Sequence, residues 1–326
     1  MILGFCLSCL FFIMNLIYIV VQKNKVVFII RNEIGKLLMI SYYKKYAPYL
    51  FLLPSAVILC LFFFLPFFDT IILSFKDYSS NIYAPNWVGL NNYIQLMHSS
   101  EFYKVILNTF IFLFCAVPLL AIIPLILAIM INQKIKGITL YKLLIYLPVI
   151  VSIVVAAIAF KWLFAQSGIL NYVIGLIGVQ PIGWLTDTRF ALFSVIMVTV
   201  WKGLGYYMMI YLAALMSAPK DLYEACDVDG ANFIQKHLTV SLPHLMPTIA
   251  LVTTISSISA LKVFAEIYVM TKGGPLNSSK TIVYYIYERA FENLDLGMAS
   301  AASVILLCIV MVFSVINIVF FEGKKY

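Results

Sequence analysis

Seven long apolar stretches alternate with shorter polar segments along the chain. Each stretch is close to the ~20 residues that an α-helix needs to cross ~30 Å of hydrocarbon. The stretches lack the alternation of barrel strands, and backbone groups in lipid must be hydrogen-bonded internally, so the pattern predicts transmembrane helices. The predicted spans are residues 2–21, 49–68, 105–131, 143–165, 190–216, 246–270 and 299–321.

The composition excludes a soluble globular protein. Of the 326 residues, 63% are hydrophobic and only 11% are charged. Water-soluble domains carry roughly a quarter of charged residues, because their surfaces must be hydrated. The sequence therefore predicts an all-α, polytopic membrane protein.

The net charge of +8 would suit a nucleic-acid-binding protein, but the positions of the charges indicate a membrane topology instead. Of the 22 Lys and Arg residues, 13 lie in alternate polar segments and only 6 lie in the segments between them. Basic residues accumulate on the cytoplasmic side of a membrane protein. The segments predicted to be cytoplasmic are residues 22–46, 132–142, 217–246 and 322–326.

Residues 1–46 consist of the apolar run 2–21 and a basic linker. No basic residue precedes the run and no small-residue cleavage site follows it, so it does not resemble a signal peptide. Two interpretations stay open: an extra N-terminal transmembrane helix, or an assigned start that is too early, with Met39 as the true start. The other predicted domains are a transmembrane domain over residues 47–321 and a cytoplasmic tail over residues 322–326.

The cytoplasmic segment 217–246, here called the elbow, is a polar island between two spans. Pro219 suits the start of a helix, and apolar positions then recur at helical spacing. Gly230 can adopt the left-handed conformation that ends a helix, and a second short helix is predicted from Ala231 towards Pro243. The pattern alone fits either a connector lying on the surface or a site that another protein contacts closely.

The elbow resembles the EAA loop of bacterial ABC importer permeases. It contains Glu-Ala, then Asp-Gly-Ala, and nine residues separate Gly230 from Val240 of the following Val-Ser-Leu-Pro. Cys226 and Val240 are conservative departures from the family pattern. In that family the loop is a coupling helix that sits in a groove of the ATP-hydrolysing subunit, a helix-in-groove contact. The resemblance implies this role for Glu224, Ala225, Asp229, Gly230, Ala231, Leu242 and Pro243.

Further segments resemble the carbohydrate-uptake permeases of the maltose, glycerol-phosphate and multiple-sugar type, over about residues 46–321. They are residues 87–93, 168–171, 183–187, 201–207, 270–275 and 297–301. The resemblance implies a six-helix permease core in the bacterial plasma membrane, a second permease, two ATPase subunits and an extracellular solute-binding protein. The implied cargo is an oligosaccharide or related sugar, with a sugar phosphate or polyol as the alternative.

Candidate pathway residues lie in the fourth and fifth core spans. Tyr206 and Tyr207 suit a sugar, because they offer aromatic faces and hydroxyl groups, although such a pair also serves packing. Ser256, Ser259 and Val263 lie within one helical stripe, which fits a pathway wall or hydrogen bonds inside the bundle. By resemblance to the maltose-type permease, the positions that match sugar-contacting ones are Leu204, Tyr207, Ser259, Ala260 and Val263.

Lys262 and Glu266 are ionisable residues in the predicted span 246–270. An unpaired charge inside a span costs a few kcal/mol. Because the two residues are four apart on what is predicted to be one helix, they are expected to neutralise each other. A direct role in transport is the alternative.

No catalytic or metal-binding constellation stands out in the sequence. The chain lacks a Gly-x4-Gly-Lys-Ser/Thr phosphate-binding loop, and its three histidines are scattered. We therefore expect no enzyme and no cofactor on this chain, with ATP and Mg²⁺ bound by the partner ATPase. Cys6 and Cys9 have the spacing of half a zinc or redox site, but no second pair completes it, so they are interpreted as buried thiols.

A secondary transporter is the competing class. Such a protein would contain inverted repeats and ion-coordinating carboxylates or broken helices near the middle of the membrane. The sequence indicates neither feature.

Overall fold

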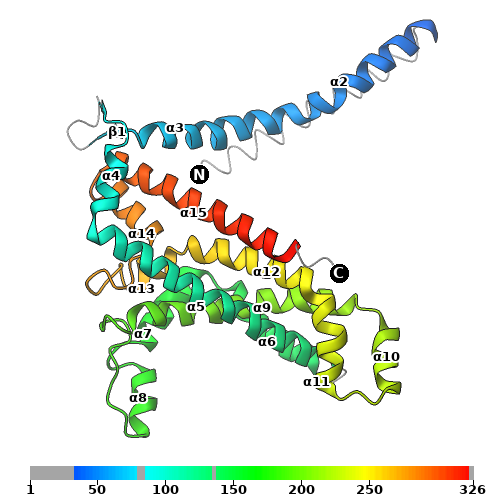
Figure 1. Cartoon of the computed structure of the whole chain (residues 1–326), viewed down its shortest axis with the longest axis vertical. Helices are drawn as coiled ribbons and strands as arrows, with labels where there is room; N and C mark the ends of the chain where they lie inside the picture. Colours follow the sequence, from blue (N-terminus) through cyan, green and yellow to red (C-terminus); the bar gives the residue numbers. More distant parts are fainter. Residues whose placement is uncertain (1–32, 79–84, 134–136, 323–326) are drawn as a thin grey trace. The chain divides into compact units, whose positions relative to one another are not determined.

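The computed structural model describes residues 33–78, 85–133 and 137–322 (Figure 1). The predicted span 2–21 and the thiols at Cys6 and Cys9 lie outside the described residues. The elements, in chain order, are α2 (Glu33–Leu59), the π-helix η1 (Cys60–Phe64), α3 (Leu65–Leu73), β1 (Lys76–Asp77), β2 (Asn86–Trp87), α4 (Asn91–His98), α5 (Ser100–Ile131), α6 (Ile138–Ile150), α7 (Ile153–Leu163), α8 (Ile169–Leu176), α9 (Ala191–Met216), α10 (Lys220–Val228), α11 (Phe233–Lys236), the π-helix η2 (His237–Ser241), α12 (Leu242–Leu261), α13 (Ala265–Met270), α14 (Ile282–Tyr287), the π-helix η3 (Glu288–Glu292) and α15 (Leu296–Glu322).

The all-α membrane fold predicted from the sequence is confirmed. Among the described residues, five helices are long and apolar enough to cross a bilayer, or six if the bent pair α6 and α7 is one span. The chain divides into two units at Phe68 and Asp69. In the first unit, α2 continues through η1 into α3 and forms the candidate span Tyr46–Leu73, whose most apolar window has no buried residue.

In the second unit, α9 is the central helix and packs against α5, α6 and α12. Its side chains Val195, Met208 and Tyr211 are fully buried. Gly205 allows α6 to approach closely, because a Cβ atom there would overlap the Ile145 carbonyl oxygen and lie 2.8 Å from Tyr146 Cα. Small residues bring membrane helices into backbone contact in this way.

Two of the predicted spans are not continuous helices. The predicted span 143–165 is divided into α6 and α7, which meet at an angle of 97°. Val151 and Ser152 between them are extended, with ψ angles of 134° and 137°. Pro148 lies in the last turn of α6 and has no N–H group, which weakens the helix just before the bend.

The second break corrects the predicted pairing of Lys262 and Glu266. α12 ends at Leu261, and α13 begins only at Ala265. Lys262 therefore lies in the break after α12 and Glu266 in α13, and no ion pair joins them among those of the described residues. The expectation that the chain has no broken helix, used above against a secondary transporter, is also wrong.

The first boundary of α5 differs from the prediction in the opposite direction, because this helix is longer than expected. The helix predicted over 105–131 begins at Ser100, where Ser99 accepts a hydrogen bond from the Phe102 N–H and caps it. Asn108 and Thr109 consequently lie inside α5 rather than at its start. Helices thus extend beyond their apolar cores into the polar loops.

Asn108 and Thr109 attach the loop 271–281 to α5. The Asn108 amide donates to the carbonyl oxygens of Asn277 and Lys280, at 2.8 and 3.0 Å. The Thr109 hydroxyl accepts from the N–H of Ile282, at 3.0 Å. This end of the bundle, called the outer end because the charge distribution places it outside, lies opposite α10 (Figure 1).

A buried lysine also stabilises the outer end. Lys280 is only 4% exposed, and its ammonium group lies 2.9 Å from a Glu101 carboxylate oxygen and 2.6 Å from one of Glu288. Arg289 pairs with the other Glu101 oxygen at 2.9 Å. The network joins the N-terminal turn of α5 to the loop before α14 and to η3.

Candidate functional site

The first elbow helix ends at Gly230, as the sequence predicts. α10 covers Lys220–Val228, and Gly230 has a φ angle of +73°. The Gly230 N–H bonds to the Asp227 carbonyl and the Ala231 N–H to that of Cys226, at 3.2 and 2.9 Å. This is the Schellman motif, which favours glycine because other L-residues are strained in the left-handed conformation.

The second part of the elbow differs from the prediction of a short separate helix from Ala231. Asn232 begins this part with a capping box, in which its side chain and backbone exchange bonds with Gln235 at 2.9 and 2.8 Å. The helix then continues through η2 into α12, giving one apolar helical segment over Phe233–Leu261. The elbow is therefore a short helix attached by a glycine turn to the end of a long one.

The elbow presents an exposed surface of mixed character. α10 stands apart from α5 and α9 (Figure 1). Val228 is 89% and Ile234 67% exposed. The acidic residues Glu224 and Asp229 are exposed as well. Of the other residues assigned to the elbow by resemblance, Ala225 and Pro243 are exposed, and Ala231 and Leu242 are half-buried.

A hydrogen-bonded chain joins α10 to η2, and the sequence reasoning missed it. The fully buried Ser241 hydroxyl lies 2.7 Å from the Tyr223 hydroxyl and 2.7 Å from His237 Nδ1. The Phe233 and His237 rings pack edge to face with centroids 4.4 Å apart. We call the three polar side chains Tyr223, His237 and Ser241 the joint. The helical spacing of the apolar positions in the elbow indicated that one side of its first helix faces inward. No local pattern indicated the bond from Tyr223 to Ser241, which lies 18 residues later.

The candidate pathway residues do not form one continuous wall. Tyr207, on α9, is buried, and its hydroxyl interacts with Ser259 on α12, which is exposed. The Tyr206 ring contacts that of Tyr207 edge to face and is 43% exposed. Leu204 is half-buried, whereas Ser256, Ala260 and Val263 are buried. Ser256 donates to the Thr253 carbonyl of its own helix, at 3.1 Å.

A polar cluster connects the two helix breaks through α9. Lys202 donates to the carbonyl oxygens of Val151 and Val149 at the α6–α7 break, at 2.8 and 3.3 Å. It also attracts the carboxylate of Glu266 in the first turn of α13. Thr199, one turn before Lys202, lies 3.4 Å from a Glu266 oxygen. Backbone carbonyls freed at a break need such donors in lipid, so Lys202 stabilises the bend that the sequence did not reveal.

Comparison with known proteins identifies the family. Residues 87–322 match the family described as the binding-protein-dependent transport system inner membrane component. The probable ABC transporter permease protein YurN of Bacillus subtilis (strain 168) is 34% identical over 86% of this chain and 98% of its own length. The arabinooligosaccharides transport system permease protein AraP of the same organism is 33% identical over 85% of this chain and 89% of its own length.

A solved structure agrees with the sequence relatives. A chain in the crystal structure of a bacterial ABC transporter involved in the import of the acidic polysaccharide alginate superposes with a TM-score of 0.79. The sequence identity is 25%, over 89% of this chain and 99% of that chain. The resemblance inferred from the elbow and the loop segments is thereby confirmed. The chain belongs to the inner membrane components of binding-protein-dependent transport systems, the permease subunits of ABC importers.

Proposed function

We propose that this chain is one of two transmembrane subunits of an ATP-driven importer of an oligosaccharide in the bacterial plasma membrane. It pairs with a second, similar permease and with two ATPase subunits, which bind ATP and Mg²⁺. An extracellular solute-binding protein delivers the sugar, in keeping with the name of the family. This chain itself hydrolyses no ATP.

The elbow is the observation that carries the proposal. Its exposed apolar side chains, Val228 and Ile234, and its exposed Glu224 suit a partner groove with an apolar floor and a basic rim. Apart from its two chain neighbours, a Cβ atom at Gly230 would meet no atom of the described residues within 4 Å, so the space beside the turn is open to a partner. Residues Ala225 and Ala231 are small enough for close approach.

The joint and α12 are the proposed route from the ATPase to the pathway. Motion of α10 reaches η2 through the bond between Tyr223 and Ser241, because this hydroxyl pair directly links the two helices. η2 continues into α12, which ends at the break beside α13 and the polar cluster. Closure of the ATPase pair then changes which side of the membrane the pathway faces, which makes the nucleotide and sugar sites energetically coupled.

A test of the joint follows from its geometry. Tyr223→Phe removes one hydroxyl and leaves the ring, so the folded chain loses a single bond, worth about 1 kcal/mol. We expect the number of sugar molecules transported per ATP hydrolysed to fall several-fold in the reconstituted complex. Tyr141→Phe, at an exposed tyrosine of α6, is the matched control and should keep the ratio. An unchanged ratio in Tyr223→Phe would show that coupling does not pass through the joint.

The proposed cargo rests on the relatives and on the side chains near the pathway. The arabinooligosaccharide permease and the alginate importer both handle sugars. Tyr206 and Ser259, both accessible, offer an aromatic face and hydroxyl groups for a sugar. A sugar phosphate or polyol is the second candidate, because Lys202 of the polar cluster can attract an anionic group.

One specific observation favours a secondary transporter, namely the two helix breaks near Lys202 and Glu266. In that class of protein, broken helices form the ion and substrate sites. Membership of the ABC importer family outweighs this observation. The broken helices are instead assigned to the wall of an ATP-driven pathway.

The experiment is uptake by proteoliposomes that contain both permeases and both ATPase subunits, with loaded binding protein outside. The panel of sugars is arabinotriose, maltotriose, lactose and trigalacturonate. We expect ATP-dependent uptake of at least one of them, unaffected when ionophores collapse the sodium and proton gradients at constant ATP. Uptake by this chain alone, driven by either gradient, would refute the importer assignment.

A further inference from the structure

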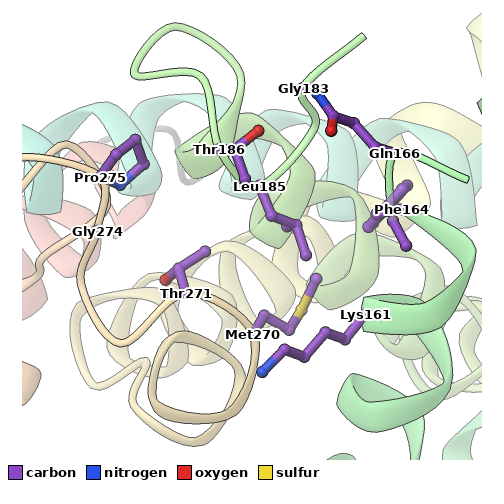
Figure 2. A pocket seen from close by; sticks show the side chains of 11 residues that line it. Lys161, Phe164, Gln166, Gly183, Leu185, Thr186, Met270, Thr271, Gly274 and Pro275 are labelled. Carbon is purple, nitrogen blue, oxygen red and sulfur yellow. The ribbon is translucent and has the colours of Figure 1, made fainter. Parts of the chain in front are cut away.

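A cavity of about 550 Å³ lies at the outer end of the bundle, away from the elbow and the polar cluster. It is bordered by the C-terminal end of α7, the loops before and after α8, and the end of α13 with the loop that follows it (Figure 2). Its size falls within the range of pockets that hold small ligands. We call it the outer pocket.

One wall of the outer pocket is held in place by Asn171. This buried side chain donates to the carbonyl oxygens of Gln166 and Ile182, at 3.2 and 3.0 Å, and accepts from the Ile182 N–H at 3.0 Å. The Trp184 indole N–H also donates to it, at 3.1 Å. The loops before and after α8 are therefore fastened to each other through Asn171 of that helix, and the positions of Gln166 and Thr186 do not depend on a ligand.

The opposite wall is fastened by Ser279. Its hydroxyl, itself buried, lies 2.7 Å from the Gly274 carbonyl oxygen and 2.8 Å from the Thr271 hydroxyl. Pro275 follows in the same short loop. Because both walls are fixed by their own buried hydrogen bonds, the pocket is already formed in the ligand-free chain, which is typical of binding sites.

The lining combines apolar surface with polar groups that retain bonding capacity. Leu185 and Met270 point toward each other, between Lys161 and the loop that carries Thr186 (Figure 2). Lys161 makes one long contact, at 3.4 Å to the Val269 carbonyl, and forms no ion pair within the described part of the chain. Gln166 and Thr186 are exposed, so their amide and hydroxyl groups are free to bind a ligand.

This combination suits a sugar better than other small ligands. A pyranose ring has an apolar C–H face that can lie against Leu185 and Met270, and peripheral hydroxyls that can bond to Gln166 and Thr186. A few polar groups around an apolar surface give orientation and specificity. The Lys161 ammonium can donate to a hydroxyl or, more strongly, to a carboxylate of an acidic sugar.

The position of the pocket relates it to the pathway. Met270 at the pocket and Glu266 in the polar cluster both belong to α13, a helix of six residues. At 1.5 Å per residue, this helix is about 9 Å long. A chain of sugar units held in the outer pocket would thus reach the polar cluster within the length of one or two units.

We propose that the outer pocket is a binding subsite for one sugar unit of the transported oligosaccharide, occupied before the sugar reaches the polar cluster. Gln166 and Thr186 bind its hydroxyl groups, and Lys161 donates to a further oxygen. The proposal rests on the proposed function, because it assumes that the cargo is a sugar.

The first test is protection from chemical labelling in the assembled transporter without binding protein. Thr186→Cys is labelled with a membrane-impermeant maleimide in the presence and absence of each sugar of the panel. We expect the sugar that is transported best to slow labelling about fivefold or more at saturation, since a bound unit covers this position. Thr188→Cys, an exposed threonine of the same loop that does not line the pocket, is the matched control and should be labelled at one rate throughout.

The second test measures uptake with saturating loaded binding protein. Gln166→Leu and Lys161→Met each remove hydrogen-bond donors to the sugar, so uptake should fall up to about tenfold. The labelling assay is repeated with Lys161→Met added to Thr186→Cys. If trigalacturonate then loses more of its protection of the cysteine than maltotriose does, the Lys161 ammonium binds a carboxylate. An equal loss for the two sugars assigns the ammonium to a hydroxyl. Both results support the subsite.

Two outcomes distinguish a failure of the proposed subsite from a failure of the proposed function. Normal ATP-dependent uptake together with no protection of Thr186→Cys and no loss in Gln166→Leu would overturn the subsite alone. No uptake of any panel sugar by the unmodified complex would overturn the proposed sugar cargo and the subsite with it.

Discussion

Replacing Gly230 with valine should abolish transport, while the chain still inserts into the membrane and assembles with its partner permease. Gly230 has a φ angle of +73° and donates one of the two bonds of the Schellman motif that ends α10. A Cβ atom in this conformation costs roughly 1–2 kcal/mol. The β-branched side chain would also occupy the open space beside the turn, so the ATPase surface could no longer approach Ala225 and Ala231. Uptake and sugar-stimulated ATP hydrolysis should both be lost.

The chain contains a control with the same backbone geometry. Gly178 ends α8 with a φ angle of +80°, its N–H and that of Val179 bond to Gly175 and Ile174, and a Cβ atom there also meets nothing within 4 Å. Gly178→Val therefore imposes the same backbone strain in a loop that lies away from the elbow. It should retain transport if the defect of Gly230→Val arises at the ATPase contact. Normal transport and ATPase stimulation by Gly230→Val would reduce the elbow to a connector.

Lys280→Met is expected to give the largest loss of stability. The substitution removes the buried cation between Glu101 and Glu288 and leaves both carboxylates without it. Breaking a buried ion pair from one side costs about 3–5 kcal/mol. The lower end applies here, because the two carboxylates are 28% and 22% exposed and Arg289 still pairs with Glu101. The thermal midpoint of the purified protein in detergent should fall by several degrees.

Two further variants make this prediction decisive. Lys272→Met changes an exposed lysine of the same loop and should leave the midpoint unchanged. Lys280→Met combined with Glu288→Gln should recover part of the loss, since one of the uncompensated charges is then absent. A midpoint for Lys280→Met equal to that of Lys272→Met would show that the outer end does not depend on the buried cation.

The features that depend on short segments were predicted from the sequence. Apolar length alone located the spans that lie within the described residues, although not their breaks, and the left-handed turn at Gly230 follows from a residue type with a strong local preference. The EAA resemblance indicated the family for a similar reason, because the elbow is a contiguous segment. Its coupling role, and the pathway role of Tyr207 and Ser259, remain predictions.

The helix breaks were not predicted, because the groups that stabilise them are remote in sequence. The carbonyl of Val151 at the first break is satisfied by Lys202, which follows 51 residues later. An apolar run shows where a helix can lie in lipid but not where a distant donor allows it to stop. Pro148 was the one local signal. The supposed pairing of Lys262 with Glu266 failed because it assumed a continuous helix between them.

Because α11, η2 and α12 form one continuous helical segment, a movement of the elbow is transmitted along it. The segment Phe233–Leu261 has 29 residues and is bent rather than straight (Figure 1). Pro247 lies inside α12 and has no N–H group, which favours such a bend. The part of α12 from Pro247 to Leu261 is about 22 Å long at 1.5 Å per residue, so a tilt of roughly 5° displaces its far end by about 2 Å. That far end adjoins the break before α13. In the proposed importer, a small rotation at the ATPase would thus reach this break as a shift of the end of α12.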